Sequence, residues 1–319
     1  MNLIEIRIET ERTDYTGGDI VAGRCILHLD RAIPVRGVRV RFHGFEYACW
    51  PSHGGRTRRV FQERKDLFDQ EETLVGHPAL DIRGAISDAV NGIFSREQYD
   101  ILEAGTYTYD FDFRLPDQLP GDFESLGLSR IAYELTAYVD MPLKLDISTT
   151  LYLTVYETDD QEEIQSVTRK VRRRSPIGAT NSIELAVTLD RDRFFPGDQV
   201  NGSALIANRS QKRIRAIAAT VNQIVDLSAR GFHTSQVHPT PVLEIRKPEL
   251  SQGEATPIPL TFEIPRDLYS SVSQGELVRV SYEVCVSVDV ARARDLMVRL
   301  PITIIEKAGA PAGVERGDA

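Results

Sequence analysis

The sequence predicts an all-β protein made of two tandem antiparallel β-sandwich domains. Three observations carry this prediction: an alternating strand that occurs twice, a glycine-containing turn that occurs twice, and a chain of 319 residues. That length suits two globular domains of roughly 100 to 200 residues each. The strand recurs after 149 positions, whereas solenoid repeats recur after about 20 to 50 residues. We therefore expect two related domains rather than a repeat array.

The duplicated strand spans residues 130–140, RIAYELTAYVD, and residues 279–289, RVSYEVCVSVD. In both copies apolar side chains occupy every second position, which is the period of a strand with one buried face. Tyr133 and Tyr282 hold the same position in the two copies. We expect each tyrosine to fill the centre of its own sandwich, with its hydroxyl near a polar partner.

The duplicated turn is YTGGDIVAG at residues 15–23 and FPGDQVNG at residues 195–202. Glycine tolerates positive φ, so each segment predicts a tight turn that leads into a strand. Gly18 and Gly197 are 179 positions apart, which is 30 more than the separation of the two strands. The first half therefore carries an insertion of 30 residues between its turn and its duplicated strand.

The remaining strands follow from the same alternation of apolar and polar residues. We expect them at residues 4–8, 25–29, 35–42, 107–115 and 151–155 in the first half, and at 214–221, 258–264 and 300–304 in the second. In the strand at 35–42, the expected inward residues are Val38, Val40 and Phe42, and the expected outward residues are Arg39, Arg41 and His43.

The insertion holds two segments of different character. Residues 50–64 lack periodicity and contain a proline and two adjacent glycines, so we expect an exposed, mobile loop. Residues 81–94 place apolar side chains at helical spacing, which predicts one short helix in the N-terminal domain. We interpret this helix as packing on the sandwich; docking to a partner or to a membrane is the alternative.

These patterns define the expected domain boundaries. The N-terminal β-sandwich should cover residues 1–158 and the C-terminal β-sandwich residues 183–306. Residues 159–182 have low hydrophobicity, with acidic residues followed by basic ones, and are expected to form a linker. Residues 307–319 are rich in alanine, glycine and proline and are expected to be a disordered tail.

The composition excludes several classes of function. A net charge of −9 argues against nucleic acid as the main partner, because phosphate binding is driven by clustered positive charge. Charged residues stand where a secretory signal needs an apolar core, and no run approaches about 18 apolar residues, so we expect a cytoplasmic protein. Three widely spaced cysteines predict neither disulfides nor a thiolate zinc site.

The sequence also lacks the motifs that carry chemistry. It contains no nucleophile elbow, phosphate-binding loop, dinucleotide fingerprint or His-Glu-x-x-His motif. The six histidines do not form a recognisable set of metal ligands. We therefore expect no enzymatic activity, no cofactor and no metal site.

Taken in order, the motifs resemble those of the arrestin family, specifically the α-arrestins, from about residue 4 to residue 305. The resemblance rests on VRVRFHGFE at 38–46, FDFRLP at 111–116, LPGDFE at 119–124, FPGD at 195–198 and ANRS at 207–210. Each motif alone is weak, but their order, spacing and duplication together are specific. The resemblance implies two tandem arrestin-like, immunoglobulin-like sandwiches.

The resemblance further implies a non-enzymatic adaptor or scaffold. Such a protein binds other proteins, including the cytoplasmic tails of membrane proteins, through loops at the domain junction. By position, residues 50–64 look like the finger loop of the family, which inserts into partners, and residues 81–94 are placed like the short helix of visual-type arrestins. The chain lacks a Pro-Pro-x-Tyr motif, so the resemblance does not extend to the recruitment of ubiquitin ligases.

Two sets of residues are candidate binding sites. The first is the partner-binding set in the finger-like loop: Trp50, Arg56, Arg58 and Arg59. Tryptophan and arginine are enriched at interface hot spots. The competing interpretation is a surface insertion without function.

The second set is basic, with Lys170, Arg172, Arg173 and Arg174 following Arg169. It suits an acidic surface, either anionic lipid headgroups, as a weak peripheral membrane contact, or an acidic or phosphorylated peptide. A solvated charge run balanced by the acidic residues at 159–163 is the competing interpretation. For the whole protein, a ligand-binding or carbohydrate-binding β-sandwich is the alternative function, because sandwiches host many functions.

Overall fold

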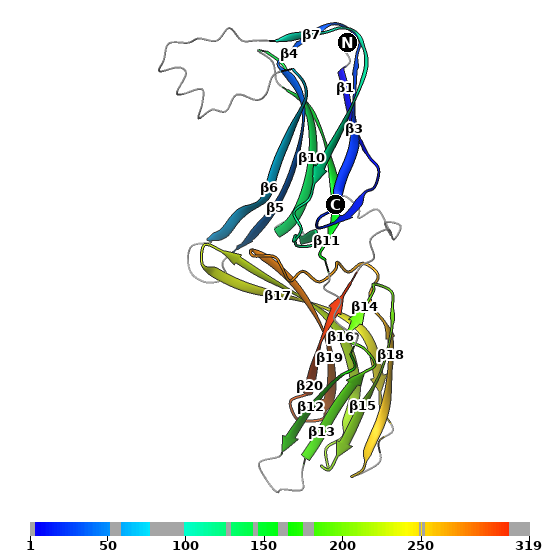
Figure 1. The fold of residues 1–319 in the computed structure, drawn as a ribbon. Coiled ribbons are helices and arrows are strands. Elements are labelled where there is room, and N and C mark those ends of the chain that lie inside the picture. The colour runs from blue at the N-terminus through cyan, green and yellow to red at the C-terminus, as the bar shows by residue number, and fades with distance from the viewer. Residues whose placement is uncertain are drawn as a thin grey trace. The chain divides into compact units, whose positions relative to one another are not determined.

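The computed structural model describes residues 4–51, 59–76, 99–125, 129–142, 146–158, 165–174, 182–248, 250 and 253–305 (Figure 1). Within these residues the regular structure is β-strand throughout, so the predicted all-β class is confirmed. The chain divides into two compact units, Met1–Trp50 with Arg64–Thr158 and Pro51–Glu63 with Asp159–Ala319.

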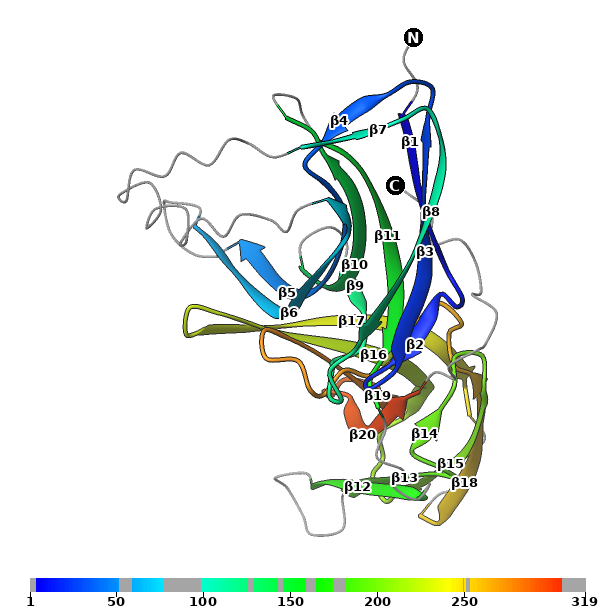
Figure 2. The ribbon, with the colours of Figure 1, turned by 45° about the horizontal axis from the view of Figure 1, so that its top comes forward.

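The first sandwich is built from two main sheets. The smaller one has the order β1 (Ile4–Thr10), β3 (Ile20–Leu29), β8 (Gly105–Arg114). The larger one has the order β2 (Asp14–Thr16), β11 (Ile147–Tyr156), β10 (Ser129–Asp140), β5 (Gly37–Pro51), β6 (Val60–Gly76), with β9 (Phe123–Ser125) beside β10. A short ladder joins β4 (Ile33–Val35) to β7 (Asp100–Leu102). Figure 2 shows the two main sheets on opposite sides of the sandwich.

The second sandwich repeats this arrangement. One sheet has the order β12 (Val167–Arg174), β13 (Ser182–Leu189), β15 (Gln199–Asn208), β18 (Ala255–Glu263). The other has the order β14 (Arg193–Phe194), β20 (Leu296–Ile304), β19 (Val278–Val290), β16 (Ile214–Ala229), β17 (Phe232–Arg246). Strand β12 extends its sheet beyond β13 and has no counterpart among the described strands of the first sandwich.

The duplicated tyrosines occupy equivalent central strands, as predicted. Tyr133 on β10 is 1% exposed, and its hydroxyl donates to the carbonyl oxygen of Pro120 at 2.5 Å. Tyr282 on β19 is 2% exposed, and its hydroxyl donates to the carbonyl oxygen of Tyr269 at 2.8 Å. In both units the bond reaches back thirteen residues along the chain. Burial of the ring and satisfaction of the hydroxyl therefore occur together.

The duplicated turns are also equivalent in detail. Gly18 has φ of 84° and Gly197 has φ of 85°, a conformation that favours glycine. The carboxylate of Asp19 accepts from the amide of Thr16 at 2.9 Å. In the second unit, the carboxylate of Asp198 accepts from the amide of Phe195 at 3.0 Å. Each turn thereby fixes the short strand that pairs in parallel with β11 or β20.

The structure corrects two expectations about irregular segments and does not reach two others. Residues 167–174, assigned to the linker, form strand β12, because they pair along their whole length with β13. Both ends of the expected loop at 50–64 belong to strands, since β5 continues to Pro51 and β6 begins at Val60. The predicted helix at 81–94 and the predicted tail at 307–319 lie outside the described residues.

The face of β5 that was expected to point outward is partly covered. Arg39 is 3% exposed and His43 is 7% exposed, whereas Arg41 is exposed. Alternation along a strand assigns a side chain to a face but does not show what covers that face. Here acidic side chains of β6 and β10 pair with the basic side chains of β5, which removes them from solvent.

We predict that the two tyrosine hydroxyls stabilise their own units. Tyr133→Phe and Tyr282→Phe should each lower the free energy of unfolding by about 1 to 3 kcal/mol, because a carbonyl oxygen loses its partner inside the protein. Truncation to alanine should cost about 3 to 5 kcal/mol through lost packing. Tyr152→Phe is the matched control, since this side chain is 61% exposed. Urea unfolding of the full chain measures each effect; a control as destabilised as the two core variants would contradict the assignment.

Candidate functional site

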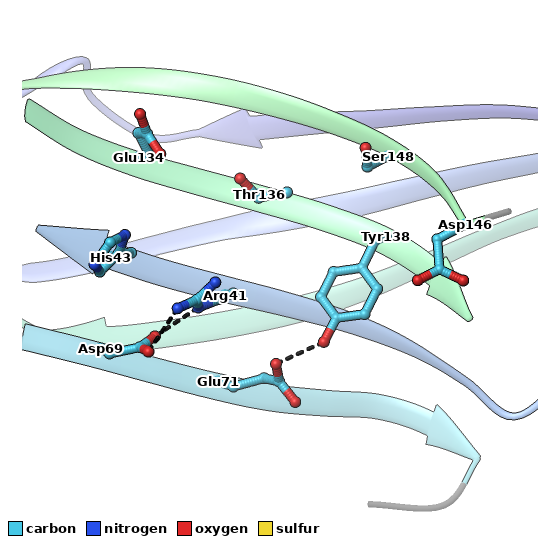
Figure 3. Close-up of a pocket in the computed structure, with 9 residues that line it drawn as sticks. All are labelled: Arg41, His43, Asp69, Glu71, Glu134, Thr136, Tyr138, Asp146 and Ser148. Carbon is cyan, nitrogen blue, oxygen red and sulfur yellow. Dashed lines mark hydrogen bonds and ion pairs between the residues drawn. The ribbon is translucent and has the colours of Figure 1, made fainter. Parts of the chain in front are cut away.

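A charged groove on the outer face of the first sandwich is the best-defined candidate site (Figure 3). Its volume is about 700 Å³. The lining side chains come from four adjacent strand segments: Arg41 and His43, Asp69 and Glu71, Glu134, Thr136 and Tyr138, and Asp146 and Ser148. Figure 3 shows them on one face of the sheet.

Strand geometry explains why these residues gather. Alternate residues of β10 face opposite sides, so the strand that buries Tyr133 and Leu135 inside presents Glu134, Thr136 and Tyr138 outside. Strand β5 lies beside β10, with Arg41 opposite Thr136 and His43 opposite Glu134. The groove is therefore the reverse face of the central strand that holds the core.

Two interactions order the β6 side of the groove. The guanidinium of Arg41 donates to both carboxylate oxygens of Asp69, each at 2.6 Å. This hydrogen bond lowers the pKa of Asp69. The hydroxyl of Tyr138 donates to Glu71 at 2.6 Å. Burial, reinforced by the bond to Glu71, raises the pKa of Tyr138 to about 12, so the phenol stays protonated at neutral pH.

A less exposed ion pair lies beside the groove. The guanidinium of Arg39 donates to Asp140 at 2.8 Å, and Arg36 donates to the other oxygen of the same carboxylate at 3.1 Å. Burial alone would raise the pKa of Asp140, but the hydrogen bonds from Arg39 and Arg36 outweigh it and lower the pKa. The Arg39 side chain is only 4% exposed, so its charge depends on this pairing.

His43 is held by its neighbours Asp66 and Phe45 at the other end of the groove. Its Nε2 atom lies 2.8 Å from Asp66, and its ring stacks on Phe45 with centroids 5.3 Å apart. The guanidinium of Arg64 lies 3.6 Å from the centre of the Phe45 ring, and that of Arg130 lies 4.9 Å from it. This cluster ties β5, β6 and β10 together by charge and by cation–π contact.

The groove presents mainly paired charges and carboxylates. Arg41 and Asp69 are paired with each other. The other carboxylates that line the groove are Glu71, Glu134 and Asp146. Among the residues that the structure describes, no three His, Cys, Asp or Glu side chains are arranged to hold a metal ion. An open, polar surface with paired charges can accept a complementary protein segment.

The charge of the chain is divided unevenly between its two halves. Residues 1–158 contain 17 Lys and Arg against 26 Asp and Glu, which gives a net charge of −9. Residues 159–319 contain 21 of each, which gives a net charge of zero. The whole net charge of the chain therefore belongs to the half that carries the groove.

The predicted loop residues occupy different environments. Trp50 lies in β5 and is only 6% exposed, so it is a strand residue and does not offer a free anchor in solvent. Arg59 is exposed directly before β6. Arg56 and Arg58 lie outside the described residues. The structure therefore brings neither Trp50 nor Arg59 into the lining of the groove.

The predicted basic set lies on β12 of the second unit. Lys170 is 63% exposed and forms an ion pair with Glu184 at 3.4 Å. Arg172, Arg173 and Arg174 continue the strand, paired with Glu184, Ile183 and Ser182 of β13. The basic residues therefore stand along the edge of a sheet and not in a flexible linker.

The sequence analysis did not find the groove. The exposed acidic residues of β6 in and beside the groove are separated by three and then two positions, at 66, 69 and 71, which hides a common face. The structure shows why, because the exposure pattern of β6 shifts by one position at Leu67 and Phe68. The available signal was the alternation of charge on β5 and β10, whose outward residues include both signs.

Comparisons with known proteins agree with this architecture. The protein-family model described as Arrestin (or S-antigen), N-terminal domain matches residues 4–162. The model described as Arrestin (or S-antigen), C-terminal domain matches residues 179–308. Within the described part of the chain, no helix is long and apolar enough to cross a membrane.

Several curated proteins are similar over most of the chain. Arrestin domain-containing protein B of Dictyostelium discoideum is 22% identical over 300 residues, which cover 92% of this chain and 44% of that protein. Arrestin domain-containing protein A of the same organism is 25% identical, covering 94% of this chain and 50% of that protein. Arrestin domain-containing protein 1 of Rattus norvegicus is 24% identical, covering 73% and 49%. The chain spans about half the length of these relatives or less.

We predict that the two carboxylates beside Arg39 and Arg41 differ in their contribution to stability. Asp140→Asn should lower the free energy of unfolding by about 3 kcal/mol, near the lower end for a broken buried ion pair, because Asp140 itself stays 20% exposed. Asp69→Asn, at an exposed pair on the same face, should cost at most about 1 kcal/mol. Urea unfolding at pH 7 compares the two variants.

The pH dependence provides the control. Because the folded-state pKa of Asp140 is lowered, its contribution is present above its unfolded pKa of about 3.9 and is lost as the pH falls through the folded value. The difference in free energy of unfolding between wild type and Asp140→Asn should therefore shrink as the pH is lowered from about 5, the range in which aspartate side chains titrate. A difference that grows with acidification would rule out this role for Asp140.

Proposed function

Because the chain belongs to the arrestin family and is α-arrestin-like, we propose that it is an adaptor that binds other proteins through loops, with the cytoplasmic tails of membrane proteins among its partners. Arrestin-family proteins are generally non-enzymatic adaptors. The proposal includes a cytoplasmic location, protein partners and no role for nucleic acid. The open, charge-paired groove supports binding rather than catalysis.

The observation that carries the proposal is the long hairpin formed by β5 and β6. Its strands have 15 and 17 residues and are joined by the segment between Pro51 and Val60. At its end, Arg59 is exposed and Val60 is 57% exposed. Exposed connections on a rigid scaffold are common places for recognition. We therefore assign the partner contact to residues 50–64.

Within this segment the four predicted residues take different roles. Trp50 is buried at the end of β5 and secures the start of the loop. Arg56, Arg58 and Arg59 supply planar cationic groups that suit carboxylate or phosphate on a partner. Trp50 therefore acts on binding through the position of the loop, whereas the arginines act by contact.

The basic residues of β12 form a second proposed contact. Lys170, Arg172, Arg173 and Arg174 together with Arg169 make five of the eight residues of this strand basic. They suit an acidic surface, and a weak peripheral contact with a membrane belongs to the same proposal. Each basic residue near an anionic lipid surface contributes about 1 kcal/mol at low salt.

We predict that replacing the loop arginines affects partner capture, whereas replacing Trp50 affects the stability of the fold. Replacing Arg56, Arg58 and Arg59 with alanine should leave the melting temperature unchanged within about 2 °C while abolishing capture of a native partner. Trp50→Ala should destabilise the protein by about 3 to 5 kcal/mol because the side chain is buried. The measurements are thermal unfolding and affinity capture from host extract with the tagged chain.

A matched control tests whether charge alone explains the loss of capture. Replacing the exposed residues Arg266, Arg292 and Arg294 with alanine removes the same number of positive charges from other connecting segments. This control should capture the partner as well as wild type. Capture that survives the change of Arg56, Arg58 and Arg59, or that is lost equally in the control, would refute the loop as the principal contact.

A further inference from the structure

We propose that the free edge of β12 binds an acidic, extended protein segment by adding it to the sheet as a further strand. This inference rests on the proposed adaptor function and names the partner chemistry of its second contact. Strand addition uses main-chain hydrogen bonds for affinity and side chains for selectivity. The evidence is the position of β12 in its sheet, the state of the other edges, and the charge of the strand.

Strand β12 is the last strand of its sheet (Figure 1). All eight of its residues pair with β13 on one side, from Val167 opposite Leu189 to Arg174 opposite Ser182. Among the described strands, none pairs with its other side. An edge strand exposes a row of N–H and C=O groups that can pair with another chain. No proline interrupts this row in β12.

The other long edges of the second unit are blocked. Strand β17 is the edge of one sheet and carries Pro239 and Pro241, and strand β18 is the edge of the other and carries Pro257 and Pro259. Prolines two residues apart remove two donors from the same side of a strand. Proline in a sheet is confined to edge strands, where its nitrogen faces solvent. Of these long edges, β12 alone keeps a full set of main-chain donors.

The charge of β12 selects the partner. Arg169 and Lys170 are exposed, although Lys170 also pairs with Glu184. In this pair the Lys170 side chain is 63% exposed and that of Glu184 is 15% exposed, so Lys170 still faces solvent. The residues of 159–319 have no net charge as a whole, so the strand is a local basic strip on a neutral half. An extended segment with acidic residues complements this strip on both of its faces.

The charge and the free edge of β12 together argue against the two main competitors. A second copy of β12 would place basic residues opposite basic residues, which destabilises a cross-strand pair. A membrane surface could satisfy the charge but could not use the main-chain donors and acceptors of the edge. Basic residues on an edge strand commonly prevent unwanted pairing, and an acidic strand is the partner that they do not repel. The edge therefore favours an acidic peptide.

The test uses the full chain and a fluorescein-labelled peptide of eight residues that alternates glutamate and threonine. We expect saturable binding by fluorescence anisotropy and slower amide hydrogen exchange confined to residues 167–174 and their partner strand. The double variant Arg169→Glu, Lys170→Glu should bind about tenfold more weakly or worse. The control Arg292→Glu, Arg294→Glu changes the same charge on an exposed turn and should bind within about twofold of wild type.

A second peptide separates strand addition from simple charge attraction. N-methylation of its four central residues removes main-chain donors and keeps every charge, so binding should be lost. Retained binding of this peptide would overturn the inference, and so would binding that ignores the double variant. Recruitment to phosphatidylserine vesicles without binding of the peptide would show that the strip binds lipid instead. Absence of both would show that its charge serves only to keep the edge unpaired.

The outcome is independent of the capture experiment. The peptide test needs no native partner and leaves residues 50–64 unchanged. Failure here with intact capture through the loop would remove the strand-addition site and keep the adaptor function. If capture does not depend on the loop but the peptide still binds, the loop contact is removed and the strand-addition site is kept.

Discussion

The hydrogen bond from one buried tyrosine hydroxyl to a carbonyl thirteen residues upstream is the constraint on which each unit depends. Tyr133 and Tyr282 sit on the central strands β10 and β19, whose neighbours on both sides are equivalent in the two units. A buried ring needs surrounding apolar contacts, and its hydroxyl needs a partner at a fixed place. Gly44 shows how tightly the first site is packed, because a Cβ atom there would lie 2.6 Å from Phe68 and 3.0 Å from the ring of Tyr133.

The same central strand links the core to the charged face. Each residue of β10 that points inward is followed by one that points outward, so the register fixed by Tyr133 also fixes Glu134, Tyr138 and Asp140. A slip of one residue would exchange the apolar and polar faces. The pairing of Arg39 with Asp140 and of Arg41 with Asp69 therefore depends on the register of the core strands, although the partners themselves lie on the outer face.

The sequence was informative where one face of a strand is apolar and the other polar. The tyrosine strands, the glycine turns and the two-unit arrangement were predictable from period and duplication. Strand β12 was not predictable, because basic residues occupy both of its faces. Only Val167, Thr168 and Val171 are not basic, and three residues are too few to show an alternating pattern. Burial of Arg39 and His43 was not predictable either, since it depends on carboxylates that reach them from β6 and β10, far away in the chain.

The unequal division of charge has a consequence for how the molecule meets a charged surface. Residues 1–158 carry a net charge of −9 and residues 159–319 carry none. An anionic bilayer repels residues 1–158 over a distance of about 10 Å at moderate salt, whereas residues 159–319 meet it with no net charge and with the basic residues of β12. Long-range repulsion from such a surface therefore acts on residues 1–158 and not on residues 159–319. This difference follows from the charge of the sequence as a whole and needs no dedicated binding residue.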